Sequence, residues 1–144
     1  AFATAMALAI PATALAEMAN FGAWLPNTRW IWNTPRIVGL VAKDCGKTPV
    51  DADFPLIAGV GYQEDSLLWT TRNKLVRFGD EVTEKNRAVI EAWCGAHPGA
   101  YLLIPRANAA EFGSFGDIAG EVRGFNYSDG NHIVDHALIR LRRP

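Results

Sequence analysis

Three polar side chains, Tyr62, Glu64 and Ser66, follow closely on the apolar run Leu56–Val60. Such a run is typical of a strand covered on both faces, and the polar residues then lie where a helix begins after it. Open α/β sheets bind ligands in the crevice beyond the carboxyl ends of their strands. These three residues are therefore the candidate ligand-binding site. A structural interpretation competes, since Glu64 and Ser66 can also accept hydrogen bonds from the free backbone N–H groups of a helix start.

Two partial motifs point to chemistry that the surrounding residues do not support. Gly59-Val60-Gly61 begins like a dinucleotide fingerprint, but Glu64 replaces the third glycine and would repel a pyrophosphate. His132 and His136 resemble a metal-binding pair, yet four residues along a strand span about 13 Å, too far for one ion. The sequence contains no complete catalytic constellation, so we expect no catalytic residue, no metal site and no cofactor within these 144 residues.

Charge and cysteine content narrow the class of protein. The net charge is −1 with 20% charged residues, which implies no nucleic-acid partner. Cys45 and Cys94 match no metal or redox spacing. They could pair in an oxidising compartment or remain two free thiols, and the sequence alone does not decide between these states.

The first 16 residues contain no charged side chain, whereas the sequence after Glu17 has the composition of a soluble domain. A transmembrane helix needs about 20 apolar residues, so this run fits the last part of one. It also fits a signal peptide ending at Ala14-Leu15-Ala16, although a positively charged start is missing. A buried, alanine-rich helix of a soluble protein is the third possibility.

Aromatic and basic side chains follow this apolar start. Tryptophan is favoured at the membrane–water boundary, and Arg36 and Lys43 share one face of a predicted helix, where they could meet a lipid phosphate. The candidate membrane or lipid-phosphate contacts are Trp24, Arg29, Trp30, Trp32, Arg36 and Lys43. Core aromatics and a solvated basic helix face are the alternatives.

The order of the predicted elements indicates an α/β fold. Helices are expected from Thr34, as the N-cap, to about Asp44, and at 64–70, 80–95 and 108–112, with Asp80 capping the third and Val82, Val89, Ile90 and Trp93 facing inward. Strands are expected at 56–60, 74–78, 101–104, 120–127 and 132–141, the last two joined by an Asp-Gly turn typical of a hairpin. The prediction is a layered α/β sandwich with a mixed sheet, βαβαβα followed by a C-terminal ββ hairpin, preceded by an apolar N-terminal helix.

Three segments together resemble one family. They are Thr34-Pro35-Arg36, Gly61-Tyr62-Gln63-Glu64-Asp65-Ser66-Leu67 and Gly124-Phe125-Asn126-Tyr127. In this order they resemble the C-terminal extracytoplasmic domain of bacterial membrane glycosyltransferases related to aminoarabinose transferase and protein mannosyltransferases (the GT-C class). Asp65 stands where that family usually has proline, and Ile139 where tyrosine is common.

The resemblance implies a parent enzyme of the inner (cytoplasmic) membrane that transfers a sugar from a polyprenyl-phosphate carrier to a lipid or protein acceptor. Its catalytic carboxylates and divalent-metal contacts lie in loops between transmembrane helices, outside this sequence, so no catalytic residue carries over. The implied organisation is the end of a transmembrane helix at 1–20, an interfacial aromatic segment and amphipathic helix at 21–46, and a soluble domain at 47–144 on the periplasmic side. This domain would contact the lipid carrier and the rest of the transferase. The alternative is a free-standing exported α/β binding protein with a signal peptide ending near Ala16.

Overall fold

The computed structural model describes residues 13, 15, 33–62, 64–126 and 132–143 of the 144-residue chain. Predictions that fall on other residues lie outside this part, including those for Trp24, Arg29, Trp30, Trp32, the apolar N-terminal helix and the turn at 128–131. Within the described residues, no helix is both long and apolar enough to cross a membrane.

A five-stranded mixed sheet in the order β2-β1-β3-β5-β4 forms the middle of the molecule. Strands β1 (Ile57–Gly59), β2 (Leu75–Arg77) and β3 (Tyr101–Pro105) run parallel to one another. Strands β4 (Gly116–Asn126) and β5 (His132–Leu141) pair antiparallel, and β5 joins them to β3. The predicted α/β class and mixed sheet are confirmed.

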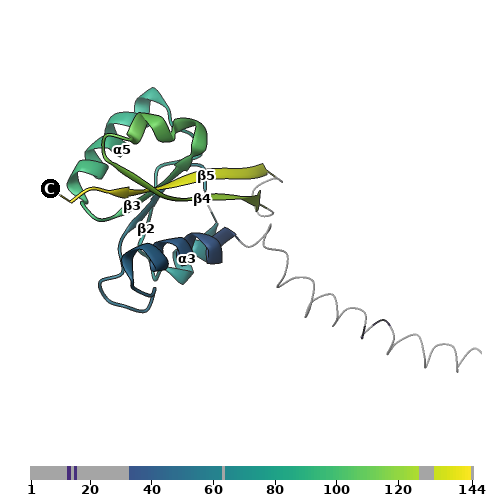
Figure 1. The fold of residues 1–144 in the computed structure, drawn as a ribbon. Coiled ribbons are helices and arrows are strands. Elements are labelled where there is room, and N and C mark those ends of the chain that lie inside the picture. Colours follow the sequence, from purple (N-terminus) through teal and green to yellow (C-terminus); the bar gives the residue numbers. More distant parts are fainter. Residues whose placement is uncertain (1–12, 14, 16–32, 63, 127–131, 144) are drawn as a thin grey trace, which may run out of the picture.

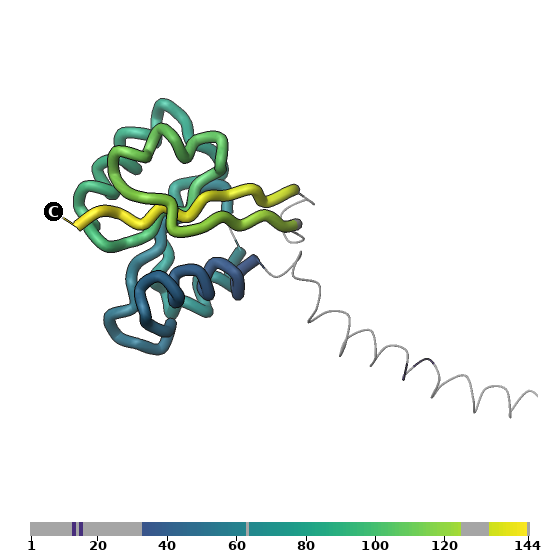
Figure 2. Tube along the Cα trace, viewed as in Figure 1, coloured from purple at the N-terminus to yellow at the C-terminus, as the bar shows by residue number. Residues whose placement is uncertain are grey.

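Helices cover both faces of this sheet (Figure 1). Helices α3 (Asn33–Cys45) and α4 (Asp65–Thr70) lie on one face, and α5 (Glu84–Ala96) with the 3-10 helix η2 (Arg106–Phe112) lies on the other. The tube in Figure 2 shows the same three layers. The α3 side of the core contains Ile37, Val38, Val41, Ile57, Tyr62, Leu67, Tyr101, Leu103, Val122, Val134 and Leu138. The α5 side contains Ala58, Val60, Ile90, Cys94, Leu102, Ile104, Phe112, Ala137 and Ile139.

Helix α3 forms because its apolar residues fall on one stripe, with Ile37, Val38 and Val41 buried against the sheet. It ends where Gly46 adopts a φ of +70°, as the sequence predicted. The predicted N-cap is wrong: Thr34 already lies inside the helix, and its hydroxyl bonds to side chains of residues 62–66 instead. Because α3 shares the core, residues 33–45 pack with the domain that was expected to begin at residue 47.

Helix α5 begins later than predicted. Its N-cap is Thr83, which forms a reciprocal capping box with Asn86, so the predicted cap at Asp80 is wrong. The residue before Asp80 takes part in a tertiary contact instead, since the carbonyl of Gly79 accepts a hydrogen bond from the Gly61 N–H, two residues after β1. The buried face of the helix also differs from the prediction: Val89, expected to face inward, is 57% exposed, while Cys94 is buried beside Ile90.

Strand β4 is longer than predicted and begins at Gly116. A β-bulge between Ile118 and Gly120 interrupts its pairing with β5. Ile118 is exposed on this edge strand, so the alternation of apolar and polar residues is lost over its first part. The sequence pattern therefore revealed only the second half of the strand.

The two cysteines lie on opposite faces of the sheet. Cys45 packs against the α3 side of the core and Cys94 belongs to the α5 side, and both are free thiols. Burial raises the pKa of the Cys94 thiol to about 11, so it remains protonated at neutral pH.

Candidate functional site

The candidate site lies at the carboxyl end of β1, where the chain turns at Gly61 and Tyr62 and enters α4. The structure brings the three predicted residues, Tyr62, Glu64 and Ser66, together there. Thr34, from the first turn of α3, joins them although it is 28 to 32 residues away in sequence. We call these four residues the hydroxyl–carboxylate cluster.

One carboxylate oxygen is the centre of this cluster. Glu64 Oε2 accepts hydrogen bonds from the Tyr62 hydroxyl at 2.7 Å, from Thr34 Oγ1 at 3.1 Å and from Ser66 Oγ at 3.1 Å. The Thr34 and Ser66 hydroxyl oxygens are 2.7 Å apart, and the Thr34 and Tyr62 oxygens 3.1 Å apart. Bonds to a charged acceptor are the stronger kind, so the cluster ties α3 to the start of α4.

Tyr62 connects the cluster to the core. Its side chain is fully buried, and burial is the main cause that raises the pKa of its hydroxyl far above the usual range, with the hydrogen bond to Glu64 adding to it. The hydroxyl therefore stays protonated and donates to Glu64. By contrast Glu64 is half-buried and Ser66 is exposed, so one side of the cluster can meet a polar ligand.

His136 on β5 lies beneath this turn. Its ring packs edge-on against Tyr62, with ring centroids 6.2 Å apart, and its Nε2 lies 2.9 Å from the carbonyl oxygen of Val60. A carbonyl can only accept, so Nε2 carries the hydrogen and Nδ1 is the unprotonated nitrogen. Burial lowers the pKa of His136, which keeps the ring neutral and makes it a support for the turn.

Gly61 is required by the close packing of this turn. Its φ is +69°, and a Cβ atom there would lie 2.8 Å from the backbone oxygen of Asp80 and 3.1 Å from His136 Nε2. Protein atoms thus fill the space above the glycine. The close approach that a dinucleotide fingerprint reserves for a phosphate is used here by the chain itself.

Arg36, from the motif segment that contains Thr34, lies near the start of the third motif segment. An Arg36 guanidinium nitrogen donates to the backbone carbonyl of Arg123, the residue before Gly124. The first two segments thus meet at the N-terminal end of α3, and the third begins one residue after the carbonyl that Arg36 contacts. Lys43, at the far end of the same helix, is exposed.

The hydroxyl–carboxylate cluster can bind a polar ligand through Glu64 and Ser66, because its three hydroxyls all contact one carboxylate oxygen on the partly open side. Within the described residues, no group of acids, histidines or cysteines is arranged to hold a metal ion. Sequence analysis found Tyr62, Glu64 and Ser66 because they are near one another in the chain. It missed Thr34, whose position before a proline was interpreted as a helix cap, and considered His136 only as a metal ligand.

A comparison with known proteins finds no matching family model, no matching curated protein and no matching solved structure.

Proposed function

We propose that this chain is a non-catalytic extracytoplasmic domain of an integral-membrane glycosyltransferase that uses a polyprenyl-phosphate sugar donor. The observation that supports this best is that two of the motif segments contact each other at the N-terminal end of α3, where Arg36 also contacts the residue directly before the third segment. Motif segments that also contact one another in the structure support the family resemblance better than each short motif does alone.

The position of this cluster suggests a mechanical role. Residue 33, where α3 begins, follows directly on the tryptophan-containing segment 21–32. The buried stripe of α3 and the hydroxyl–carboxylate cluster fix that helix end to the sheet and to α4. Such a joint would hold the domain at a defined orientation over a membrane-embedded active site and shape access for the acceptor or the lipid carrier.

In this proposal, basic residues of α3 contact the lipid carrier. Lys43 is exposed, and Arg36 is half-buried with part of its guanidinium bonded to Arg123. Each basic residue near an anionic membrane surface contributes about 1 kcal/mol of binding, or roughly a fivefold change in affinity.

Titration of the full chain with phosphatidylcholine nanodiscs, with and without polyprenyl phosphate, tests this contact through tryptophan fluorescence. We expect tighter binding when polyprenyl phosphate is present, with a difference that shrinks as salt is added. Lys43→Ala and Arg36→Ala should each weaken that binding roughly fivefold.

Lys85→Ala is the matched control, because Lys85 is an exposed lysine of α5 on the other face of the sheet. Its affinity should equal that of the unmodified chain. Equal binding with and without polyprenyl phosphate, or equal losses in all three variants, would contradict carrier contact and favour the exported binding protein.

A further inference from the structure

A pocket lies at the opposite end of β1 from the hydroxyl–carboxylate cluster. The pocket has a volume of about 420 Å³ and is lined by the C-terminal end of α3, the residues before β1, the turn before β3 and the end of β5. Neither the motif segments nor the proposed function involves it. We propose that this pocket binds the phosphate group of a ligand, with Arg143 as its principal contact.

The charges around the pocket leave one cation unmatched. Lys47 pairs with Asp53, and Arg140 lies 3.4 Å from Asp44, whose carboxylate also accepts the Tyr101 hydroxyl. Arg143 lines the same pocket, and within the described residues it forms no ion pair with a carboxylate. The three cations and two carboxylates thus leave one positive charge available to an anion.

The neighbouring Arg142, unlike Arg143, already has a carboxylate partner. Arg142 is bonded to Asp117 at 2.9 Å and does not line the pocket. Of the arginines that end the chain, Arg140 and Arg142 each have a carboxylate partner. Arg143 retains its fork of donors, which matches the geometry of a phosphate group.

The absence of a side chain at Gly99 allows the Arg143 side chain to lie close to the turn before β3. The glycine has a φ of +84°, and a Cβ there would lie 3.1 Å from Arg143 Nε. Its N–H donates to the Leu141 carbonyl, which fixes the turn against the end of β5. The guanidinium therefore lies directly over the turn, where any larger residue would displace it.

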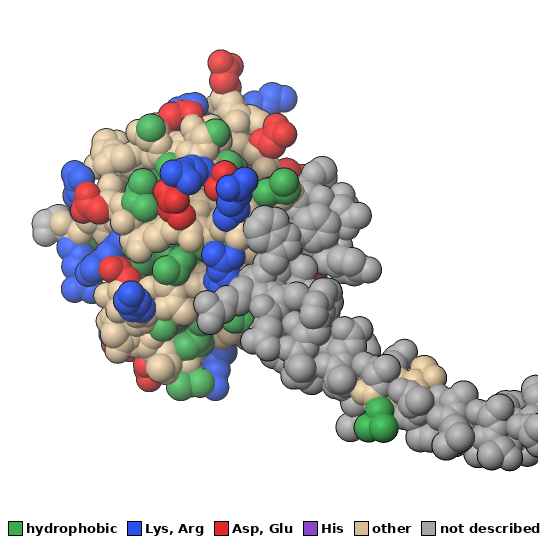
Figure 3. Space-filling model, turned by 45° about the vertical axis from the view of Figure 1, so that its right-hand side comes forward, with side chains coloured by type: hydrophobic (Ala, Val, Ile, Leu, Met, Phe, Trp, Pro, Cys, Tyr) green, Lys and Arg blue, Asp and Glu red, His purple; other side chains and the backbone are tan. Residues whose placement is uncertain are grey.

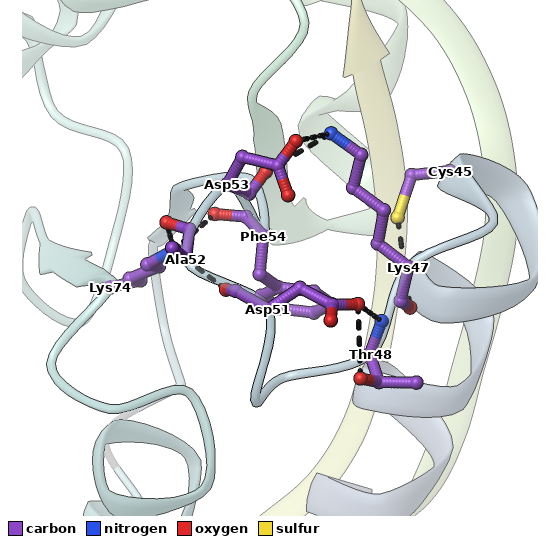
Figure 4. A network of polar contacts seen from close by, with 8 residues as sticks. All are labelled: Cys45, Lys47, Thr48, Asp51, Ala52, Asp53, Phe54 and Lys74. Atoms are coloured by element: carbon purple, nitrogen blue, oxygen red, sulfur yellow. Dashed lines mark hydrogen bonds and ion pairs between the residues drawn. The ribbon is translucent and has the colours of Figure 1, made fainter.

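The other wall of the pocket is held by a network of hydrogen bonds (Figure 4). Lys74 Nζ donates to the carbonyls of Ala52 at 2.6 Å and Phe54 at 2.8 Å, and Asp51 accepts from the Thr48 backbone at 2.6 Å. The Lys47–Asp53 pair closes the same loop. This loop is thus ordered before any ligand arrives, which lowers the entropy cost of binding.

The face shown in Figure 3 carries acidic and basic side chains interspersed, with no field of a single sign. The net charge of −1 likewise gives the chain no strong positive field, so phosphate binding would depend on local geometry such as that at Arg143. The pocket lies at the C-terminal end of the 13-residue helix α3, about 18 Å along the helix from residue 33, where the segment 21–32 joins. Lys43, proposed above to contact the lipid carrier, directly precedes the lining residue Asp44, so both a soluble phosphate compound and a lipid headgroup can reach the pocket, and the experiment below distinguishes them.

Nuclear magnetic resonance of the full chain in phosphatidylcholine nanodiscs tests this site, with the Gly99 amide as the reporter. Inorganic phosphate should shift that resonance in a saturable way, and sodium chloride of equal ionic strength should not. Arg143→Gln should weaken the apparent affinity about tenfold, as expected for loss of a charge-assisted contact. Arg143→Lys, which keeps the charge but loses the fork, should fall between the two.

Arg142→Gln is the matched control, since it removes the same charge from the adjacent residue, and its affinity should not change. Amide resonances remote from the substituted residue that are unchanged in each variant establish that the fold persists. Phosphate binding that is absent, non-saturable or equally weakened by Arg142→Gln would overturn the proposal. A shift of Gly99 that needs Arg143 and occurs only when the nanodiscs contain phosphatidic acid would assign the phosphate to a lipid headgroup.

Discussion

Gly61→Ala should lower the free energy of unfolding by about 2–4 kcal/mol, one of the two largest effects that we expect in this domain. The added Cβ would lie 2.8 Å from the backbone oxygen of Asp80, and neither that backbone nor the buried ring of His136 can move freely. The positive φ of +69° adds strain of its own. Urea denaturation of the full chain measures the change through the midpoint and the slope of the transition.

The variant Gly46→Ala measures the cost of a positive φ without the steric clash that a Cβ atom meets at position 61. Gly46 has nearly the same φ, +70°, but a Cβ there meets no atom within 4 Å. Its cost should therefore be only about 1 kcal/mol, the cost of the backbone conformation. Equal costs at the two glycines would mean that the turn at Gly61 is not packed as described.

Tyr62→Ala should destabilise the domain by about 3–5 kcal/mol, as for other large aromatic residues removed from a core. Tyr62 is fully buried between α3, the sheet and His136, and its loss would leave a cavity there. The same denaturation measurement applies.

Tyr62→Phe isolates the hydroxyl. It keeps the ring and removes one donor to Glu64, so it should cost about 1–2 kcal/mol. In a Thr34→Val background that cost should differ, because both hydroxyls contact the same carboxylate oxygen. Additive costs would show that the hydroxyl–carboxylate cluster does not act as one unit.

The parallel part of the sheet could be predicted because its signals are local. Leu56–Val60 is a short apolar run before a polar helix start, and the observed β1 and α4 lie within it and after it. The start of α5 was misplaced because two candidate caps lie close together in the sequence, Asp80 and Thr83. The structure selects Thr83, which forms a capping box with Asn86, while the Gly79 carbonyl before Asp80 bonds to Gly61, 18 positions earlier in the chain.

Only the local part of the candidate site could be predicted from the sequence. Tyr62, Glu64 and Ser66 alternate within one short segment, so their proximity follows from the chain. Thr34 reaches them only because α3 packs beside α4. The Arg143 pocket draws on four separate segments, and no motif in the sequence links them.

The central claim is that this domain belongs to a membrane glycosyltransferase. The most direct test is to detect the native polypeptide in its own cells with an antibody against the domain, after separating membrane and soluble fractions. The account predicts a polypeptide far larger than 15.7 kDa that stays in the membrane fraction after alkaline carbonate extraction. A small polypeptide that osmotic shock releases in soluble form would contradict it.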